Sequence, residues 1–296
     1  MATVIPHFQP KTKKQYALFM AVLGGLFALS LYITFGGGGS AARVKTLQQA
    51  QTLRDARKFE EADALLRAAL EAEEKKSGPD GVQGVRLMEL LAETRSDLGK
   101  EADAESYWRR ALEIRRKTLG ADHGAALEAE EALATSLLKQ GKFSDAEPLL
   151  KKTIARREKL QGVSELSLLP TLNRLAKLHL ALGKPAEAEP VARRAVTIGR
   201  KQVGLIPAGF DQSLHHLGAA LAAQDKPAEA EPFYRQALSL MSSKVSSDPR
   251  AVARPGQPTR ADVSGLCREF AGVLRKAGKE KEAQEMEAKA SSISPD

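Results

Sequence analysis

The sequence predicts an all-α fold, a right-handed superhelical solenoid of about six helical hairpins preceded by one transmembrane helix. Three observations predict it. One phrase, written most clearly as GKFSDAEPLL at residues 141–150, occurs in six related copies. Small residues stand at three fixed places in each copy, as closely packed helices require. Residues 16–35 contain no charged side chain. With aromatics at only 5%, the body is expected to consist of helices packed through Leu and Ala.

The uncharged stretch, YALFMAVLGGLFALSLYITF at residues 16–35, has about the length that a helix needs to cross a ~30 Å hydrocarbon core. A short basic tail at 1–15 precedes it. A Gly-rich tether at 36–42, which includes GGGGS, follows it and is expected to behave as flexible coil. The sequence therefore predicts a single-pass membrane anchor from which the rest of the chain hangs.

The charges that flank the stretch predict its orientation. Lys11, Lys13 and Lys14 precede it, whereas Arg43 and Lys45 follow it. Because cytoplasmic flanks carry the excess of Lys and Arg, we expect a cytoplasmic amino terminus and a translocated body.

Two other interpretations of the amino-terminal segment stay open. Small residues at 39–42 would suit cleavage of a secretory signal peptide, which would release a soluble protein, although the apolar stretch is long for one. Ala17, Ala21 and Gly25 form a row of small residues through which the span could form a homodimer.

The repeated phrase has a period of 42 residues. Its first position is occupied by Arg57, Gly99, Gly141, Gly183, Asp225 and Gly278, so the last step is 53 residues and contains an insertion of eleven. A regular period of this kind is stronger evidence for the fold than any local pattern, and it predicts a stack of similar structural units. We expect the array at 43–291, a loop between units five and six at 242–262, and a short tail at 292–296.

Each copy predicts a hairpin of two helices. The third copy places small residues seven before its glycine, five after it and twelve after it, at Ala134, Ala146 and Thr153. The glycine is expected to end the first helix in a left-handed residue. Ser144 and Asp145 are then expected to open the second helix, and a proline does so in copies four and five.

The phrase GK(F/P)xxAE, with these three small positions, resembles the tetratricopeptide repeat (TPR). The stretches RRALEIRRKTLG at 109–120 and GADHG at 120–124 are similar to the kinesin-light-chain subtype. The resemblance extends over residues 43–291. It implies a superhelix whose inner groove binds an extended peptide or a helix along the first helix of each unit.

The resemblance also implies which residues line that groove. At the fifth and ninth positions of the units it selects Glu89, Glu93, Glu131, Asn173, Lys177, His215 and Arg268. The groove would then be acidic in units two and three and neutral to basic in units four to six. TLNRLAKL at 171–178 resembles a kinesin-light-chain phrase in which the asparagine bonds the backbone of a ligand, which is the role expected of Asn173.

Enzymatic function is not expected. His215 and His216 are adjacent on a helix and point about 100° apart, so they cannot chelate one ion together. His179 is expected to be a packing residue, and Cys267 has no second cysteine or paired histidine in register. We therefore expect no catalytic residue, no cofactor and no metal. The net charge of +8 is interspersed along the chain, which argues against a nucleic-acid partner.

These features together predict a membrane-anchored scaffold or adaptor that binds a partner protein segment, with a role in assembly, secretion or chaperone-like work. The layout resembles bacterial inner-membrane TPR subunits of the secretion translocon, which would place the body on the periplasmic side. It equally resembles TPR import receptors of the mitochondrial outer membrane. A homo-oligomeric structural scaffold is the alternative.

Overall fold

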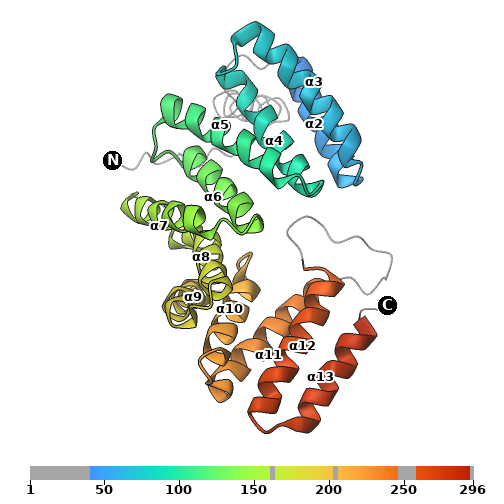
Figure 1. Cartoon of the computed structure of the whole chain (residues 1–296), viewed down its shortest axis with the longest axis vertical. Helices are drawn as coiled ribbons and strands as arrows, with labels where there is room; N and C mark the ends of the chain where they lie inside the picture. Colours follow the sequence, from blue (N-terminus) through green and yellow to red (C-terminus); the bar gives the residue numbers. More distant parts are fainter. Residues whose placement is uncertain (1–40, 161–163, 203–205, 246–257, 294–296) are drawn as a thin grey trace, which may run out of the picture. The chain divides into compact units, whose positions relative to one another are not determined.

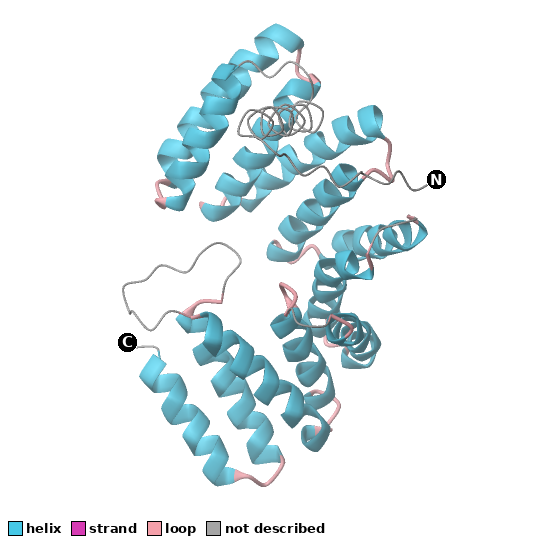
Figure 2. Cartoon of the chain, turned by 180° about the vertical axis from the view of Figure 1, so that it is seen from behind, coloured by secondary structure: helices cyan, strands magenta, loops and turns pink. Residues whose placement is uncertain are grey.

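The computed structural model describes residues 41–160, 164–202, 206–245 and 258–293, and within these ranges helices joined by turns and loops are its regular secondary structure (Figure 2). The α-helices are α2 (Ala41–Asp55), α3 (Phe59–Ser77), α4 (Val85–Asp97), α5 (Glu101–Leu119), α6 (Gly124–Lys139), α7 (Phe143–Lys159), α8 (Leu169–Ala181), α9 (Pro185–Arg200), α10 (Phe210–Ala222), α11 (Pro227–Lys244), α12 (Arg260–Lys276) and α13 (Glu280–Ile293). Short 3-10 turns, η1 (Val82–Gly84) and η2 (Glu165–Leu168), precede α4 and α8.

The chain forms two compact units, residues 1–94 and 95–296. In the first unit, α2 packs against α3. In the second, α6 packs with α7, α8 with α9, α10 with α11 and α12 with α13 (Figure 1). These pairs are helical hairpins of the kind that the 42-residue period predicts. We call the six copies of the period repeats one to six.

The ends of the array lie slightly beyond the predicted bounds. The helix α2 already begins at Ala41, inside the predicted tether, and α13 continues to Ile293, inside the predicted tail. The predicted membrane span at 16–35 lies outside the described residues. Among the helices that the structure does describe, each is too short or too polar to cross a bilayer.

The helices on either side of the predicted loop at 242–262 extend into it. The helix α11 ends at Lys244, and α12 begins after Thr259. Thr259 and Asp262 form a capping box, in which the Thr259 side chain accepts from the Asp262 backbone and the Asp262 side chain accepts from the Thr259 backbone. This reciprocal cap satisfies free backbone donors of the first turn, so α12 begins inside the predicted loop.

The small positions lie where the helices come closest. In repeat three, Ala134, Ala146 and Thr153 are essentially inaccessible to solvent. Repeat five has glycine at the first of these positions, and a Cβ built on Gly218 would lie 2.8 Å from the ring of Tyr234. The larger aromatic side chain therefore needs the smaller partner. In repeat one the third small residue, Ala69, is only partly buried, as expected at the end of an array.

The turns between the paired helices are left-handed, as predicted. The glycines at the first position of the phrase have φ between 67° and 76°. Arg57 and Asp225, which replace glycine in repeats one and five, adopt φ of 57° and 60°. A left-handed conformation is unfavourable for a side chain with a Cβ, more so for arginine than for aspartate.

The predicted cap residues are partly wrong. Pro185 is the first residue of α9, as expected, but α7 begins at Phe143. Lys142 therefore stands at the cap position of α7, with no side-chain cap, and Ser144 and Asp145 already lie inside the helix. Only Lys142 separates the left-handed Gly141 from the first residue of α7, so there is no room for a separate serine cap.

Ion pairs between neighbouring repeats use the lysine and the glutamate of the repeated phrase. Lys142 Nζ of repeat three lies 2.7 Å from Oε2 of Glu105 in repeat two. Lys279 Nζ lies 2.9 Å from Oε1 of Glu231 in the repeat before it. The same pair joins repeats four and five. The lysine of GK thus points back to the glutamate of AE one repeat earlier, and we call these contacts the inter-repeat ion pairs.

The carboxylates of these pairs are poor bases. Burial raises the pKa of Glu105, but hydrogen bonds from Lys142, Arg109 and Gln140 outweigh it and lower the pKa to about 2. The pKa of Glu189 is also lowered to about 2, by hydrogen bonds from an arginine and a glutamine. Both values lie below the ordinary value of 4.5. The stabilisation from a carboxylate of lowered pKa is complete above the unfolded value and is lost as the pH falls through the folded one.

Acidification should therefore weaken the array between about pH 4.5 and 2. We expect the free energy of unfolding of residues 41–296 to fall less steeply over this window in the double variant Glu105→Gln, Glu189→Gln than in the wild type. Urea melts at several pH values measure this slope. Glu128 is an exposed carboxylate of α6 with no ion pair among the described residues, so Glu128→Gln serves as the control. Equal slopes in the double variant and the control would contradict the prediction.

Candidate functional site

The predicted groove residues all lie on the first helices of their repeats, α4, α6, α8, α10 and α12. Their surroundings differ sharply from one repeat to the next. The acidic members are paired within the chain, and two basic members are open to solvent.

In the first unit, the two predicted acidic groove residues have basic partners. Glu89 is buried, and its Oε2 lies 3.3 Å from Nη1 of Arg86, one turn earlier on α4. Glu93 Oε2 lies 2.5 Å from Nη1 of Arg54 on α2. Glu89 thus pairs within its own helix and Glu93 pairs with the preceding repeat, so each carboxylate already has a cation beside it before any partner protein arrives.

In the second unit, Glu131 is also enclosed. Its Oε1 accepts from Nε of Arg157 on α7 at 3.0 Å and from the hydroxyl of Thr171 on α8. Arg174, also on α8, lies 3.7 Å from its other oxygen. Burial lowers the pKa of Arg174, and the charge of Glu131 opposes that effect. Glu131 is thus the centre of a polar cluster that joins repeats three and four.

Asn173 does not present its amide to solvent. It is 3% exposed, and its Nδ2 donates to the carbonyl of Gly209 at 2.8 Å. Its Oδ1 accepts from the hydroxyl of Ser213 at 2.7 Å. Gly209 has φ of 80° and stands at the cap of α10. Asn173 therefore orients the start of the next repeat, and the role in binding a ligand backbone that the resemblance implied is revised accordingly.

His215 connects α10 to α12. Its Nε2 lies 2.7 Å from Oε2 of Glu269, and its ring stacks on that of His216. The hydrogen bond from His215 lowers the pKa of Glu269 against the effect of burial. His216 is buried, and burial followed by the nearby charges of His215 and Lys177 lowers its pKa to about 3. His216 is thus neutral at physiological pH.

Lys177 on α8 and Arg268 on α12 are exposed, and neither has an ion-pair partner within the described part of the chain. Lys177 lies near His216 on α10, and Arg268 is adjacent in sequence to Glu269, the partner of His215. The helix α8 also packs against α10. We call the exposed face of α8, α10 and α12 around Lys177, His215 and Arg268 the basic face.

These residues lie on first helices, as predicted, but their partners within the chain were not predicted. The predicted change of sign along the groove requires free carboxylates, and the structure places Glu131 against two arginines. One of them could have been found from the register, since Arg174 follows Glu131 by one 42-residue period and one residue. Glu269 was also missed, because it stands beside the selected positions.

Comparison with protein families matches two tetratricopeptide repeat models. One covers residues 41–116, 86–159 and 129–201, more than half of the chain, and the other covers 212–246. The chain belongs to the tetratricopeptide repeat family. No curated protein gives a significant match.

Solved structures share the TPR fold. The kinesin-light-chain TPR-like repeats of Podosopora anserina match with a TM-score of 0.56 and 22% identity, over 71% of this chain and 93% of that chain. BtubC (BKLC) from P. vanneervenii matches with 0.63 and 20%, over 79% and 90%. The apo form of RapI matches with 0.59 and 13%, over 84% and 96%. These likenesses concern the fold alone.

A second candidate surface of this TPR protein is formed by α5, α6 and α7. An open cleft of about 470 Å³ is lined by Arg109, Leu112, Glu113, Arg116, Lys117, Leu133 and Leu149. Each cation that lines it has an ion-pair partner: Arg109 pairs with Glu105, Arg116 with Glu130 and Lys117 with Glu113. On the basic face, by contrast, Lys177 and Arg268 are exposed without an ion-pair partner among the described residues.

The single cysteine is poorly suited to nucleophilic chemistry in this TPR fold. Cys267 is fully buried in α12, and burial raises the pKa of its thiol against the opposing charge of Lys289. A cysteine nucleophile reacts as the thiolate, which this environment disfavours.

Proposed function

We propose that the protein is a membrane-anchored TPR scaffold that holds an extended, acidic segment of a partner protein on the basic face. The observation that carries this proposal is that, among the described residues, the cations of the groove positions are unpaired and exposed, whereas the carboxylates are paired. Lys177 and Arg268 are exposed without an ion-pair partner in the described residues, whereas Glu131 is buried between arginines. Unpaired surface cations attract a partner of opposite charge and fix its direction.

The basic face also has room for a peptide backbone. Ala219 of α10 is partly exposed, and a Cβ built on Gly272 of α12 would meet no atom within 4 Å. These residues occupy the same ninth position as Lys177 on α8. Small side chains beside the cations let a partner backbone approach the helices closely, as the fold's peptide-binding use requires.

Anchoring by residues 16–35 is the other part of the proposal. It is supported by the uncharged length of that stretch and by the lysines before it, which favour a cytoplasmic amino terminus and an exported body. On this basis we place the body on the periplasmic side of a bacterial inner membrane. Retention in the membrane after a carbonate wash, and activity of an export-dependent reporter fused after Asp296, would support it. A shortened soluble product would show cleavage instead.

Site-specific crosslinking tests the basic face directly. A photoreactive residue at position 219 is expected to capture a partner protein in intact cells, which mass spectrometry then identifies. The same residue at position 152, on the exposed side of α7, is the control. Capture only from position 152 would place the partner on the second helices and contradict the proposal.

Charge reversal then tests the chemistry of the contact with a synthetic peptide of the identified segment. We expect Lys177→Glu with Arg268→Glu to weaken binding by about tenfold or more at low salt, and we expect added salt to reduce the wild-type affinity. The matched control is Lys152→Glu with Lys281→Glu, which reverses two exposed lysines of second helices that have no ion pair in the described chain. Equal losses in the two double variants would reject a specific role for the basic face.

A further inference from the structure

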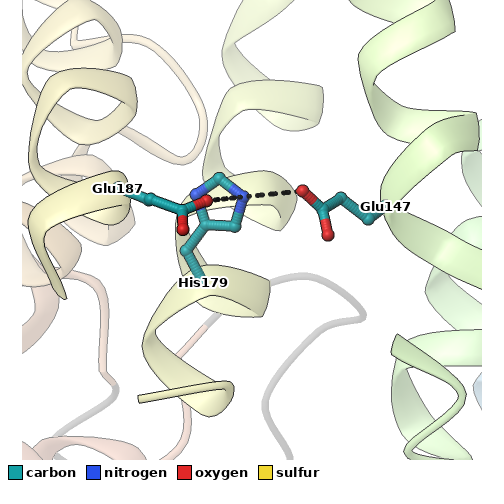
Figure 3. A group of neighbouring side chains, drawn as sticks. All are labelled: Glu147, His179 and Glu187. Atoms are coloured by element: carbon teal, nitrogen blue, oxygen red, sulfur yellow. Dashed lines mark hydrogen bonds and ion pairs between the residues drawn. The ribbon is translucent and has the colours of Figure 1, made fainter. Parts of the chain in front are cut away.

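Three side chains from three helices converge where repeats three and four meet. His179 of α8 lies between Glu147 of α7 and Glu187 of α9 (Figure 3). Its Nε2 is 3.4 Å from Oε1 of Glu147 and 3.8 Å from Oε2 of Glu187. All three donor atoms lie within 4.8 Å of one another. His179 is 3% exposed, whereas the Glu187 side chain is about half exposed.

These distances suit a shared metal ion. Zinc binds imidazole nitrogen and carboxylate oxygen at about 2.0–2.2 Å, so two ligands of a tetrahedral ion lie about 3.3–3.5 Å apart. The contact of His179 with Glu147 already has this spacing, and the one with Glu187 exceeds it by a few tenths of an ångström. Glu187 is near the solvent and can close that gap by a small rotation.

The junction between repeats three and four differs from most other junctions in two respects. Four residues before the turn, repeats one, three, five and six have leucine, whereas repeat four has His179. In repeats three, five and six the lysine after the turn forms the inter-repeat ion pair, whereas Lys184 of repeat four lies 3.4 Å from Glu187 of its own repeat. From the next repeat, Glu147 thus faces the imidazole of His179, where Glu105, Glu189 and Glu231 face an ammonium group.

A buried imidazole in a leucine position is costly unless its polar atoms are satisfied. Nδ1 of His179 has no hydrogen-bond partner in the described structure, and Nε2 is directed at the two carboxylates. Packing alone would be served by leucine. A histidine whose Nε2 faces two carboxylates instead places three metal-binding donor atoms at this junction, which leucine would not.

We propose that Glu147, His179 and Glu187 bind a divalent transition-metal ion of the zinc class, which ties repeat three to repeat four. Water would complete the coordination on the exposed side of Glu187. The ion must displace Lys151, whose Nζ lies 2.5 Å from Oε1 of Glu147, and Lys184. Both lysine side chains are about half exposed, and such surface ion pairs are weak.

The test uses the full chain purified in detergent and stripped of metal. Added ZnCl₂ is expected to bind at about one ion per chain by equilibrium dialysis and to raise the melting temperature by roughly 5 °C at a large excess over the dissociation constant. MgCl₂ at the same concentration should leave the melting temperature unchanged, since magnesium prefers all-oxygen sites.

His179→Leu is the decisive variant, because leucine is the residue of the equivalent position in four other repeats. It should fold and lose both the bound zinc and the shift. Glu187→Gln is a second variant at an exposed position and should weaken zinc binding by about tenfold or more. His123→Asn removes a histidine elsewhere while keeping a good residue at the cap of α6, and should bind zinc as the wild type does. The proposal fails if zinc leaves the wild type unchanged, or if His179→Leu retains the zinc.

Discussion

Replacing Arg116 and Arg156 together by alanine is expected to lower the free energy of unfolding by about 3–5 kcal/mol. Both arginines bind Glu130, which is 0% exposed: Nη2 of Arg116 lies 2.9 Å from Oε1, and Nη1 of Arg156 lies 2.9 Å from Oε2. Without them a carboxylate stays buried with no cation to balance it. Urea melts of residues 41–296, followed by helical circular dichroism, measure the loss.

A triple variant separates the buried charge from other effects of the two substitutions. Adding Glu130→Leu removes the charge and places leucine where repeats four and five have Leu172 and Leu214. Replacing a buried ion pair by an apolar residue of similar volume is often neutral, so most of the lost stability should return. A triple variant no more stable than the double one would mean that the arginines act in some other way.

Gly199→Ala is expected to destabilise the fold by about 1–3 kcal/mol, although alanine normally favours a helix. A Cβ at this position of α9 would lie 2.2 Å from Cδ2 and 2.6 Å from Cε2 of the Phe210 ring. Phe210 is the first residue of α10 and is 7% exposed, so it has little space to move. The ring packs directly on the backbone of the preceding helix.

The control for this variant is another glycine inside a helix. A Cβ on Gly272 of α12 would meet nothing within 4 Å. Gly272→Ala should therefore gain about 0.5–1 kcal/mol from helix propensity alone. The same urea melts compare the two variants, and a gain from Gly199→Ala would show that the ring moves aside without cost.

The hairpins could be predicted because their signal is local and repeated. Side-chain size alone limits how closely two helices approach, so Ala134, Ala146 and Thr153 were sufficient to locate the contact in repeat three. The cap residues were harder, because Ser144 and Asp145 favour a helix start wherever they occur. In the structure, the geometry of the turn at Gly141 decides where α7 begins.

The electrostatics of the candidate site could be predicted only in part. A sequence shows that Glu131 is acidic, but its partners Arg157 and Arg174 lie 26 and 43 residues away. Burial decides whether a charge is available to a partner protein, and it depends on such distant contacts. Glu130 gave one usable signal, since it stands where repeats four and five have leucine.

The histidine cluster had no such signal in its spacing. Glu147, His179 and Glu187 are separated by 32 and 8 residues, and they come from three different helices. Metal-site patterns that are recognised in sequences rely on ligands one turn apart or on paired cysteines. Only the packing of α7, α8 and α9 brings these donor atoms together.

The inter-repeat ion pairs have a consequence for how such an array can grow or shrink. At three junctions a repeat supplies the lysine and the repeat before it supplies the glutamate, as Lys142 and Glu105 do. A gene duplication of one 42-residue segment would therefore add one cation and one anion, already matched to its new neighbours. Repeat four is the exception, because a second copy of His179 would meet the carboxylate of a different predecessor. The number of ordinary repeats can drift in descendants of this chain, whereas the junction at His179 can be inherited only as a whole.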